Sequence, residues 1–134
     1  MDYRFVSRIK VYFRDVDMLG HVNNVAYAGY LEIARVDLLE SLFGRDGFER
    51  MPYVLGELHV RYLRPARLRD VLEVGIRIGE IGRKSFTYDY ILRDAATGEV
   101  KAEARTVQVM CDFRTGKTYE VPQEVRDAVA AAAT

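Results

Sequence analysis

The stretch Phe13–Arg35, FRDVDMLGHVNNVAYAGYLEIAR, decides the fold and carries the candidate chemistry. Its middle part, Asp17–Asn24, holds an acid, an imidazole and two amides, and it has too few apolar residues to belong to a core. Glycine and asparagine are typical of turns and of helix caps. The sequence therefore predicts a polar loop that runs directly into a helix.

Residues 25–43 have the spacing of an amphipathic helix, with apolar residues at steps of three and four. The apolar positions are Tyr27, Tyr30, Leu31, Ala34, Leu38, Leu39 and Leu42, and the charged ones, mainly on the other side, are Glu32, Arg35, Asp37 and Glu40. Asn23 or Asn24 is placed to cap the first turn, and Gly44 is placed to end the helix. Gly29 costs about 1 kcal/mol relative to alanine in a helix, so it predicts the close approach of another backbone.

After this helix the apolar pattern changes to period two, which is typical of strands. The predicted strands are 8–13 before the loop and 54–63, 72–79, 86–92 and 100–113 after the helix. A short helix is predicted over 121–132, opened by Pro122. The element order predicts an α+β fold, in which an antiparallel sheet of five to six strands, the last four as a meander, wraps around one long central helix.

The composition argues against several classes of function. Lys plus Arg and Asp plus Glu number 20 each, so no net basic field attracts nucleic acid. No apolar run approaches the length of a membrane span, and the N-terminus lacks the core of a signal peptide, so we expect a cytoplasmic protein. A length of 134 residues suits one domain, 1–134, with a single core.

The residues that bind metals are sparse. One cysteine, Cys111, and two histidines, His21 and His59, are too few for a structural zinc site, and we expect no metal and no cofactor. Cys111 is expected to be a small buried side chain. One helix covers one face of a sheet and leaves an edge strand open, which predicts at least a homodimer.

Several short motifs carry a family resemblance. They are Phe13-Arg14-Asp15-Val16-Asp17, Gly20-His21-Val22-Asn23-Asn24, Tyr27 with the helix to Arg35, Val60-Arg61-Tyr62-Leu63-Arg64-Pro65-Ala66 and Arg83-Lys84-Ser85-Phe86. Together they resemble hotdog-fold acyl-CoA thioesterases of the 4-hydroxybenzoyl-CoA thioesterase type, including small bacterial enzymes associated with the Tol-Pal system and with long-chain acyl-CoA hydrolysis. The resemblance covers nearly the whole chain and implies hydrolysis of an acyl-CoA thioester, with coenzyme A as part of the substrate.

The resemblance implies roles for four residues of the loop and the helix start. Asp17 matches the catalytic carboxylate, either as the nucleophile or as the base that activates water. The backbone N–H near Asn24 matches the oxyanion hole at the N-terminus of the helix. His21 either orients substrate or water, or bonds to a backbone carbonyl and fixes the turn. Asn23 either contacts substrate or only caps the helix.

Other residues are expected to bind the substrate. In the family, the basic turn of Arg83, Lys84 and Ser85 lies near the entrance for the nucleotide part of coenzyme A, where it either meets phosphates or forms a solvated hairpin. A second basic stretch around Pro65 either receives phosphates as well or flanks an edge strand, and we expect it at the surface; it comprises Arg61, Arg64, Arg67 and Arg69. The pocket for an aliphatic or aromatic acyl group is expected to be lined by Tyr27, Tyr30 and Tyr62.

Three alternatives stay open from the sequence. The HVNN motif at His21–Asn24 also resembles plant acyl-carrier-protein thioesterases, so the thioester carrier is not fixed. A related hotdog enzyme dehydrates hydroxyacyl thioesters, but the Asp17 loop argues against that chemistry. A non-catalytic module that senses an acyl thioester is the remaining rival, because a fold alone does not fix a function. Relatives pair two dimers, which implies a homotetramer.

Overall fold

The computed structural model describes residues 3–133, except the side chains of Phe48, Arg50, Ala132 and Ala133. The strands are β1 (Phe5–Lys10), β2 (Tyr53–Tyr62), β3 (Val71–Ile81), β4 (Ser85–Asp94) and β5 (Val100–Met110). The helices are α1 (Ala26–Phe43), α2 (Gly47–Arg50), α3 (Gln123–Ala133) and a short 3-10 helix, η1 (Phe13–Asp15). The predicted domain spans 1–134, of which residues 1, 2 and 134 lie outside the described residues.

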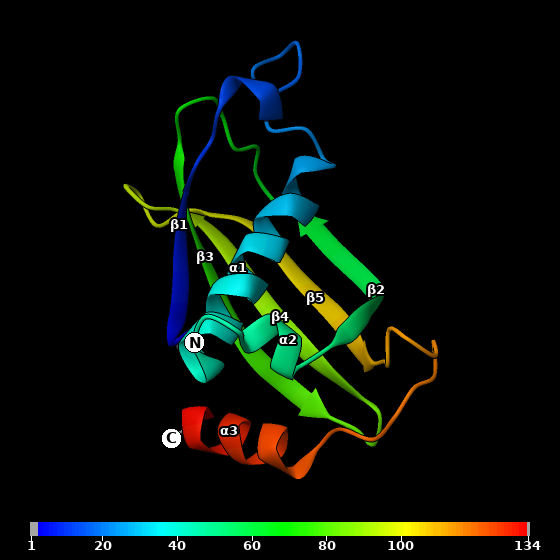
Figure 1. The fold of residues 1–134 in the computed structure, drawn as a ribbon. Helices are drawn as coiled ribbons and strands as arrows, with labels where there is room; N and C mark the ends of the chain where they lie inside the picture. The colour runs from blue at the N-terminus through cyan, green and yellow to red at the C-terminus, as the bar shows by residue number, and fades with distance from the viewer. Residues whose placement is uncertain (1–2, 134) are drawn as a thin grey trace.

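The five strands form one antiparallel sheet, and α1 lies over one of its faces. Figure 1 shows β1 and β2 on either side of α1, so the sheet flanks the helix along its length. This arrangement confirms the predicted α+β fold, with five strands and one long central helix.

The predicted meander of four strands is wrong in one respect. The order in the sheet is β1-β3-β4-β5-β2, so only β3, β4 and β5 follow one another as neighbours. β2 pairs with β5, with Tyr53 opposite Met110 and Tyr62 opposite Ala102. A period-two pattern identifies the two faces of a strand but not its neighbours. β1 takes the place beside β3, and the connection 63–70 crosses from the β2 edge of the sheet to β3, near the other edge.

Two predicted strand boundaries also shift. The first strand ends at Lys10 rather than residue 13, because Phe13–Asp15 form the 3-10 turn. The last strand ends at Met110, and Cys111 makes only an isolated bridge to Thr118. Cys111 is buried, as predicted.

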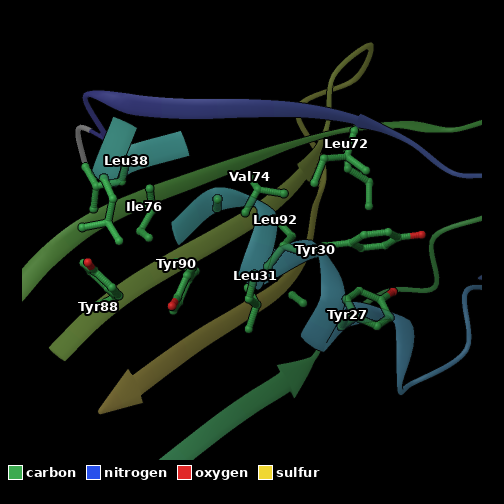
Figure 2. Packing of buried hydrophobic residues seen from close by; sticks show 14 of the residues in the cluster. Tyr27, Tyr30, Leu31, Leu38, Leu72, Val74, Ile76, Tyr88, Tyr90 and Leu92 are labelled. Carbon is green, nitrogen blue, oxygen red and sulfur yellow. The ribbon is translucent and has the colours of Figure 1, made fainter. Parts of the chain in front are cut away.

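The core lies between α1 and the sheet. The predicted apolar stripe of α1 is buried except for Leu42, which is half-buried. Figure 2 shows Leu31 and Leu38 of α1 among Leu72, Val74 and Ile76 of β3. Fully burying one such side chain stabilises the fold by about 1.5–3 kcal/mol.

Two predictions about α1 are wrong. Arg35, assigned to the polar side, is buried with 8% of its surface exposed. Gly29 has open space around it, since a Cβ built on it meets nothing within 4 Å, so no second backbone approaches it within the described chain. Gly44, by contrast, has a φ of 81° and donates its N–H to the carbonyl of Glu40 at 2.8 Å, which ends the helix as expected.

Candidate active site

The loop before α1 is closed around the carboxylate of Asp17. Its Oδ1 accepts hydrogen bonds from the backbone N–H of Leu19 at 2.9 Å and of His21 at 3.2 Å. The N–H of Asp17 donates to the carbonyl of His21 at 2.8 Å, and Gly20 adopts a φ of 77° that a glycine takes without strain. Oδ2 has no hydrogen-bond partner among residues 3–133. One oxygen therefore fixes the loop, and the other stays available.

Two anchors hold this loop against the body of the protein. The hydroxyl of Tyr30 donates to Oδ2 of Asp15 at 2.9 Å, and the carbonyl of Asp15 accepts the N–H of Asn23 at 2.7 Å. Burial, and then the hydrogen bond to Asp15, raise the pKa of Tyr30 well above its usual range, so the phenol remains a neutral donor. The second anchor is backbone pairing, in which Val22 N–H donates to the carbonyl of Ala66 at 2.8 Å.

Asn23 and Asn24, just before α1, have different hydrogen-bond partners. Asn23 Oδ1 accepts the N–H of Val25 at 3.0 Å in the turn just before α1, whereas the N-cap residue of α1 is Val25, which has no side-chain cap. The carbonyl of Asn24 accepts the hydroxyl of Tyr62 at 3.0 Å. The N–H of Asn24 has no partner within the described chain. The helix start therefore offers one unpaired donor at its positive end.

A cavity of about 250 Å³ opens at this point. Four predicted site residues line it together, Asp17, His21, Asn24 and Tyr27. The other lining residues are Val22, Tyr62, Leu63, Arg64 and Pro65. Tyr27 and Tyr62 meet edge to face with ring centroids 5.0 Å apart. Desolvation by burial raises the pKa of Tyr27, which keeps its hydroxyl neutral.

The lining differs from the sequence-based set in two places. Arg64 belongs to the cavity wall, although its basic stretch was assigned to the surface. Recognising it requires knowing that β2 ends beside the start of α1, which the Tyr62 bond to Asn24 shows. Tyr30 is not part of the lining, because its hydroxyl is turned to Asp15 instead.

The predicted basic turn lies elsewhere in the chain. β1 ends with Lys10 paired to Val71, next to the loop, whereas Arg83, Lys84 and Ser85 follow the far end of β3. Figure 1 shows this turn and the loop at opposite ends of the sheet. One chain therefore does not bring the basic turn together with Asp17.

Segments near the C-terminus hold this basic turn in place. Arg83 Nε donates to Glu120 Oε1 at 2.8 Å, and Lys84 Nζ donates to Thr118 Oγ1 at 3.2 Å. Gly82 N–H donates to the carbonyl of Ser85 at 2.7 Å, which closes the turn. The turn is thus a fixed basic surface.

Two further features bear on function. In the part of the chain that the structure describes, no three His, Cys, Asp or Glu side chains are grouped so that they could hold a metal ion. None of the helices within that part combines the length and the apolar character needed to cross a membrane.

Known proteins resemble this chain over nearly its whole length. The family model described as "Thioesterase-like superfamily" matches residues 11–129. Long-chain acyl-CoA thioesterase FadM of Escherichia coli (strain K12) is 31% identical over 126 residues, which cover 90% of this chain and 93% of that protein. A chloroplastic dodecanoyl-acyl-carrier-protein hydrolase of Cinnamomum camphora is 27% identical over 83% of this chain but only 27% of its own length.

The same similarity appears in three dimensions. A crystal structure of a thioesterase from Thermus thermophilus, complexed with coenzyme A and Zn, has a TM-score of 0.86 and is 31% identical in sequence. The superposition covers 96% of this chain and 98% of that one. This overlap confirms the hotdog architecture expected from the sequence.

Proposed function

The chain belongs to the thioesterase-like superfamily, and from that premise we propose that it hydrolyses acyl-CoA thioesters to a free acid and coenzyme A at the Asp17 loop. The observation that carries the proposal is the pairing of two available groups in one cavity. Asp17 keeps one carboxylate oxygen free while the loop holds the other, and Asn24, whose N–H is unpaired within the described chain, lines the same cavity.

Two routes use this arrangement. In the first, Asp17 Oδ2 attacks the thioester carbonyl, the C–S bond breaks, and the mixed anhydride that forms is then hydrolysed by water. In the second, Asp17 takes a proton from a water molecule as that water attacks the carbonyl. Both routes release the coenzyme A thiol and the acid, and neither requires a cofactor beyond the coenzyme A of the substrate.

The start of α1 supplies the electrostatic part of the mechanism. Negative charge develops on the carbonyl oxygen during attack, and the N–H of Asn24 with the dipole of α1 is suited to stabilise it. This role belongs to the backbone, so it does not depend on the carboxamide of Asn24. His21 lines the same cavity and is placed to orient the water or the thioester.

The distance between the loop and the basic turn points to two copies of the chain. A second copy would supply Arg83, Lys84 and Ser85 to the coenzyme A phosphates, while the first supplies Asp17. β2 is the edge strand on which such copies would meet, since Leu55 and Leu58 are 45% and 40% exposed. We therefore propose a homodimer joined along β2, with two dimers forming a tetramer, in the cytoplasm.

A thioester on an acyl carrier protein is the second candidate substrate. The similarity to the Cinnamomum camphora hydrolase favours it. Arg64, an exposed cation in the cavity wall, suits the phosphate of either carrier.

A thiol-release assay tests the proposal. Wild type and Asp17→Ala are compared on acetyl, medium-chain, long-chain and aromatic acyl-CoA, and on the matching acyl-carrier-protein thioesters. We expect turnover of acyl-CoA that the variant loses. Turnover confined to carrier-protein substrates would select the second candidate. Tight binding of an acyl-CoA without turnover of any substrate would instead indicate a sensor.

A further inference from the structure

Arg35 is a buried cation that the carboxylate of Glu32 influences electrostatically but does not pair with. It lies in the middle of α1, and its Nη1 donates to the hydroxyl of Tyr90 at 3.2 Å. No carboxylate of the described chain lies within ion-pair distance of it. A guanidinium has five N–H donors, and buried charges are normally paired. The structure therefore leaves donors of Arg35 for something else.

The side chains around Arg35 are polar as well. The hydroxyl of Tyr90 bonds to Thr106 Oγ1 at 2.6 Å, and Thr106 also accepts a bond from Gln108. The hydroxyl of Tyr88 and Oε1 of Gln108 are fully buried and have no hydrogen-bond partner among the described residues. Buried polar atoms without partners are rare and call for a specific explanation. This polar cluster comprises Arg35, Tyr88, Tyr90, Thr106 and Gln108.

A cavity of about 520 Å³ reaches one member of the polar cluster, Arg35. It lies between α1 and β2 and is lined by Glu32, Arg35, Val36, Tyr53 and Leu55. Desolvation by burial raises the pKa of Tyr53 to about 12, so its hydroxyl stays neutral at physiological pH. The cavity wall is mostly apolar, with Arg35, Glu32 and Tyr53 as its polar residues, so it suits a hydrocarbon chain that ends in a polar group.

This cavity and the Asp17 cavity lie along one seam. Tyr62 at the end of β2 meets Asn24, and Tyr53 at the start of β2 lies in the cavity of Arg35. Eleven residues separate Asn24 from Arg35, about 16 Å along a helix at 1.5 Å per residue. An acyl group that lies along the seam with its carbonyl at Asp17 would bring its far end to Arg35.

We propose that Arg35 binds an oxygen atom at the far end of the acyl group, so that the enzyme selects long acyl thioesters with an oxidised terminus. The proposal rests on the function given above, because it assigns the substrate class of that site. A terminal carboxylate would pair with the guanidinium, and a terminal hydroxyl would accept a bond from Arg35 and donate one to Glu32. Both termini offer an acceptor oxygen to the N–H groups of Arg35 other than the one bonded to Tyr90.

The kinetic test uses three acyl-CoA esters of matched chain length, with a methyl, a hydroxyl or a carboxylate terminus. Wild type is expected to prefer an oxidised terminus by about tenfold or more in kcat/KM, through KM, because a site built for a polar group rejects the analogue that lacks it. Arg35→Met should remove this preference by raising KM for the two oxidised esters to that for the methyl ester. Glu32→Gln should raise kcat/KM for the carboxylate ester and not for the hydroxyl ester, which distinguishes the two termini.

A binding experiment separates this inference from the proposed function. Isothermal titration of three long-chain methyl esters of matched length, whose far end is a methyl, a hydroxyl or a carboxylate, needs no thioester chemistry. Tighter binding of the carboxylate-ended or the hydroxyl-ended ester to wild type, lost in Arg35→Met, supports the site even if no thiol is released. Equal binding of all three esters would overturn it.

Two further outcomes keep the inference falsifiable. If Arg35→Met does not fold, Arg35→Lys takes its place, because lysine keeps the charge but not the planar set of guanidinium donors. Equal turnover of the three esters both by wild type and by Arg35→Lys would then overturn the inference. Loss of the dimer in Arg35→Met with selectivity unchanged would show instead that a second copy neutralises Arg35.

Discussion

Two polar regions lie along α1, and they are built in opposite ways. The Asp17 loop is exposed, and most of its polar atoms bond to the loop itself or to its anchors. The polar cluster around Arg35 is buried, yet Tyr88 and Gln108 each keep an atom without a partner among the described residues. A free atom at the surface is solvated, whereas a free atom in the core costs stability. The available groups of the loop are therefore open to water, whereas the unmet polar atoms of the core are not.

The first prediction tests the loop. Asp17→Asn should lower turnover by about a thousandfold or more, since it removes the carboxylate but keeps an oxygen for the bonds from Leu19 and His21. Thermal unfolding should stay near that of wild type. The readouts are thiol release and the melting temperature. Full activity in a folded variant would remove Asp17 from the chemistry.

The second prediction uses pH on the buried cluster. Burial raises the pKa of Tyr53, Tyr88 and Tyr90 above the usual 10.0, so their stabilising contribution is complete below pH 10 and falls as pH rises above it. Between pH 10 and 11 the loss should be about 1 kcal/mol for Tyr53, whose pKa is raised to about 12, and Tyr88 and Tyr90 should add to it in the same direction. Urea unfolding at pH 9, 10 and 11 measures it.

A control variant shows where the pH dependence comes from. Tyr53→Phe should reduce the loss of unfolding free energy at alkaline pH by the contribution of one tyrosine, because phenylalanine does not titrate. An alkaline loss equal in wild type and the variant would mean that Tyr53 does not contribute.

The third prediction concerns the anchor of the loop. Tyr30→Phe deletes the bond to Asp15 Oδ2 and leaves a carboxylate oxygen without its donor. We expect a loss of about 1.5–3 kcal/mol in unfolding free energy, the usual range for a bond to a charged group. The rate should also fall, because Asp15 aligns the N–H of Asn23. Asp15→Asn serves as the matched variant, and a stability equal to wild type in both would contradict the anchor.

The fourth prediction, with the smallest expected effect on stability, concerns Tyr88 in the polar cluster around Arg35. Tyr88→Phe removes a buried hydroxyl that has no partner among the described residues, so the unfolding free energy should change by less than about 1 kcal/mol or even rise. Tyr90→Phe is its control on the same strand, and it should cost more because Arg35 and Thr106 both lose a partner. Denaturant unfolding of the pair tests the contrast, and an equal cost for both would show that Tyr88 is bonded after all.

Local features of the fold were predictable from the sequence. The helix stripe and the end of the helix at Gly44 depend on residues a few positions apart. The strand order was not predictable, because alternation marks faces and not neighbours.

The residues of the candidate site likewise divide into those that the sequence could group and those that only the fold brings in. Asp17, His21, Asn24 and Tyr27 could be grouped from the sequence because they are close in it, and the structure brings them into one cavity. Arg35 was placed on the polar side because the helical pattern treats arginine as polar, while its partner Tyr90 lies on a distant strand. Arg64 lies in the cavity wall because the connection 63–70 begins beside the start of α1, and only the fold reveals this.

The backbone pairing of the loop with this crossing segment has a consequence for folding. Val22 bonds to Ala66 and Leu68 bonds to Gly20, so the loop is completed by residues more than forty positions later. Such distant contacts form slowly, because the chain must first close a long loop. We expect α1 to form early and the Asp17 geometry late, so that enzyme activity returns with the slowest refolding phase rather than with helical structure.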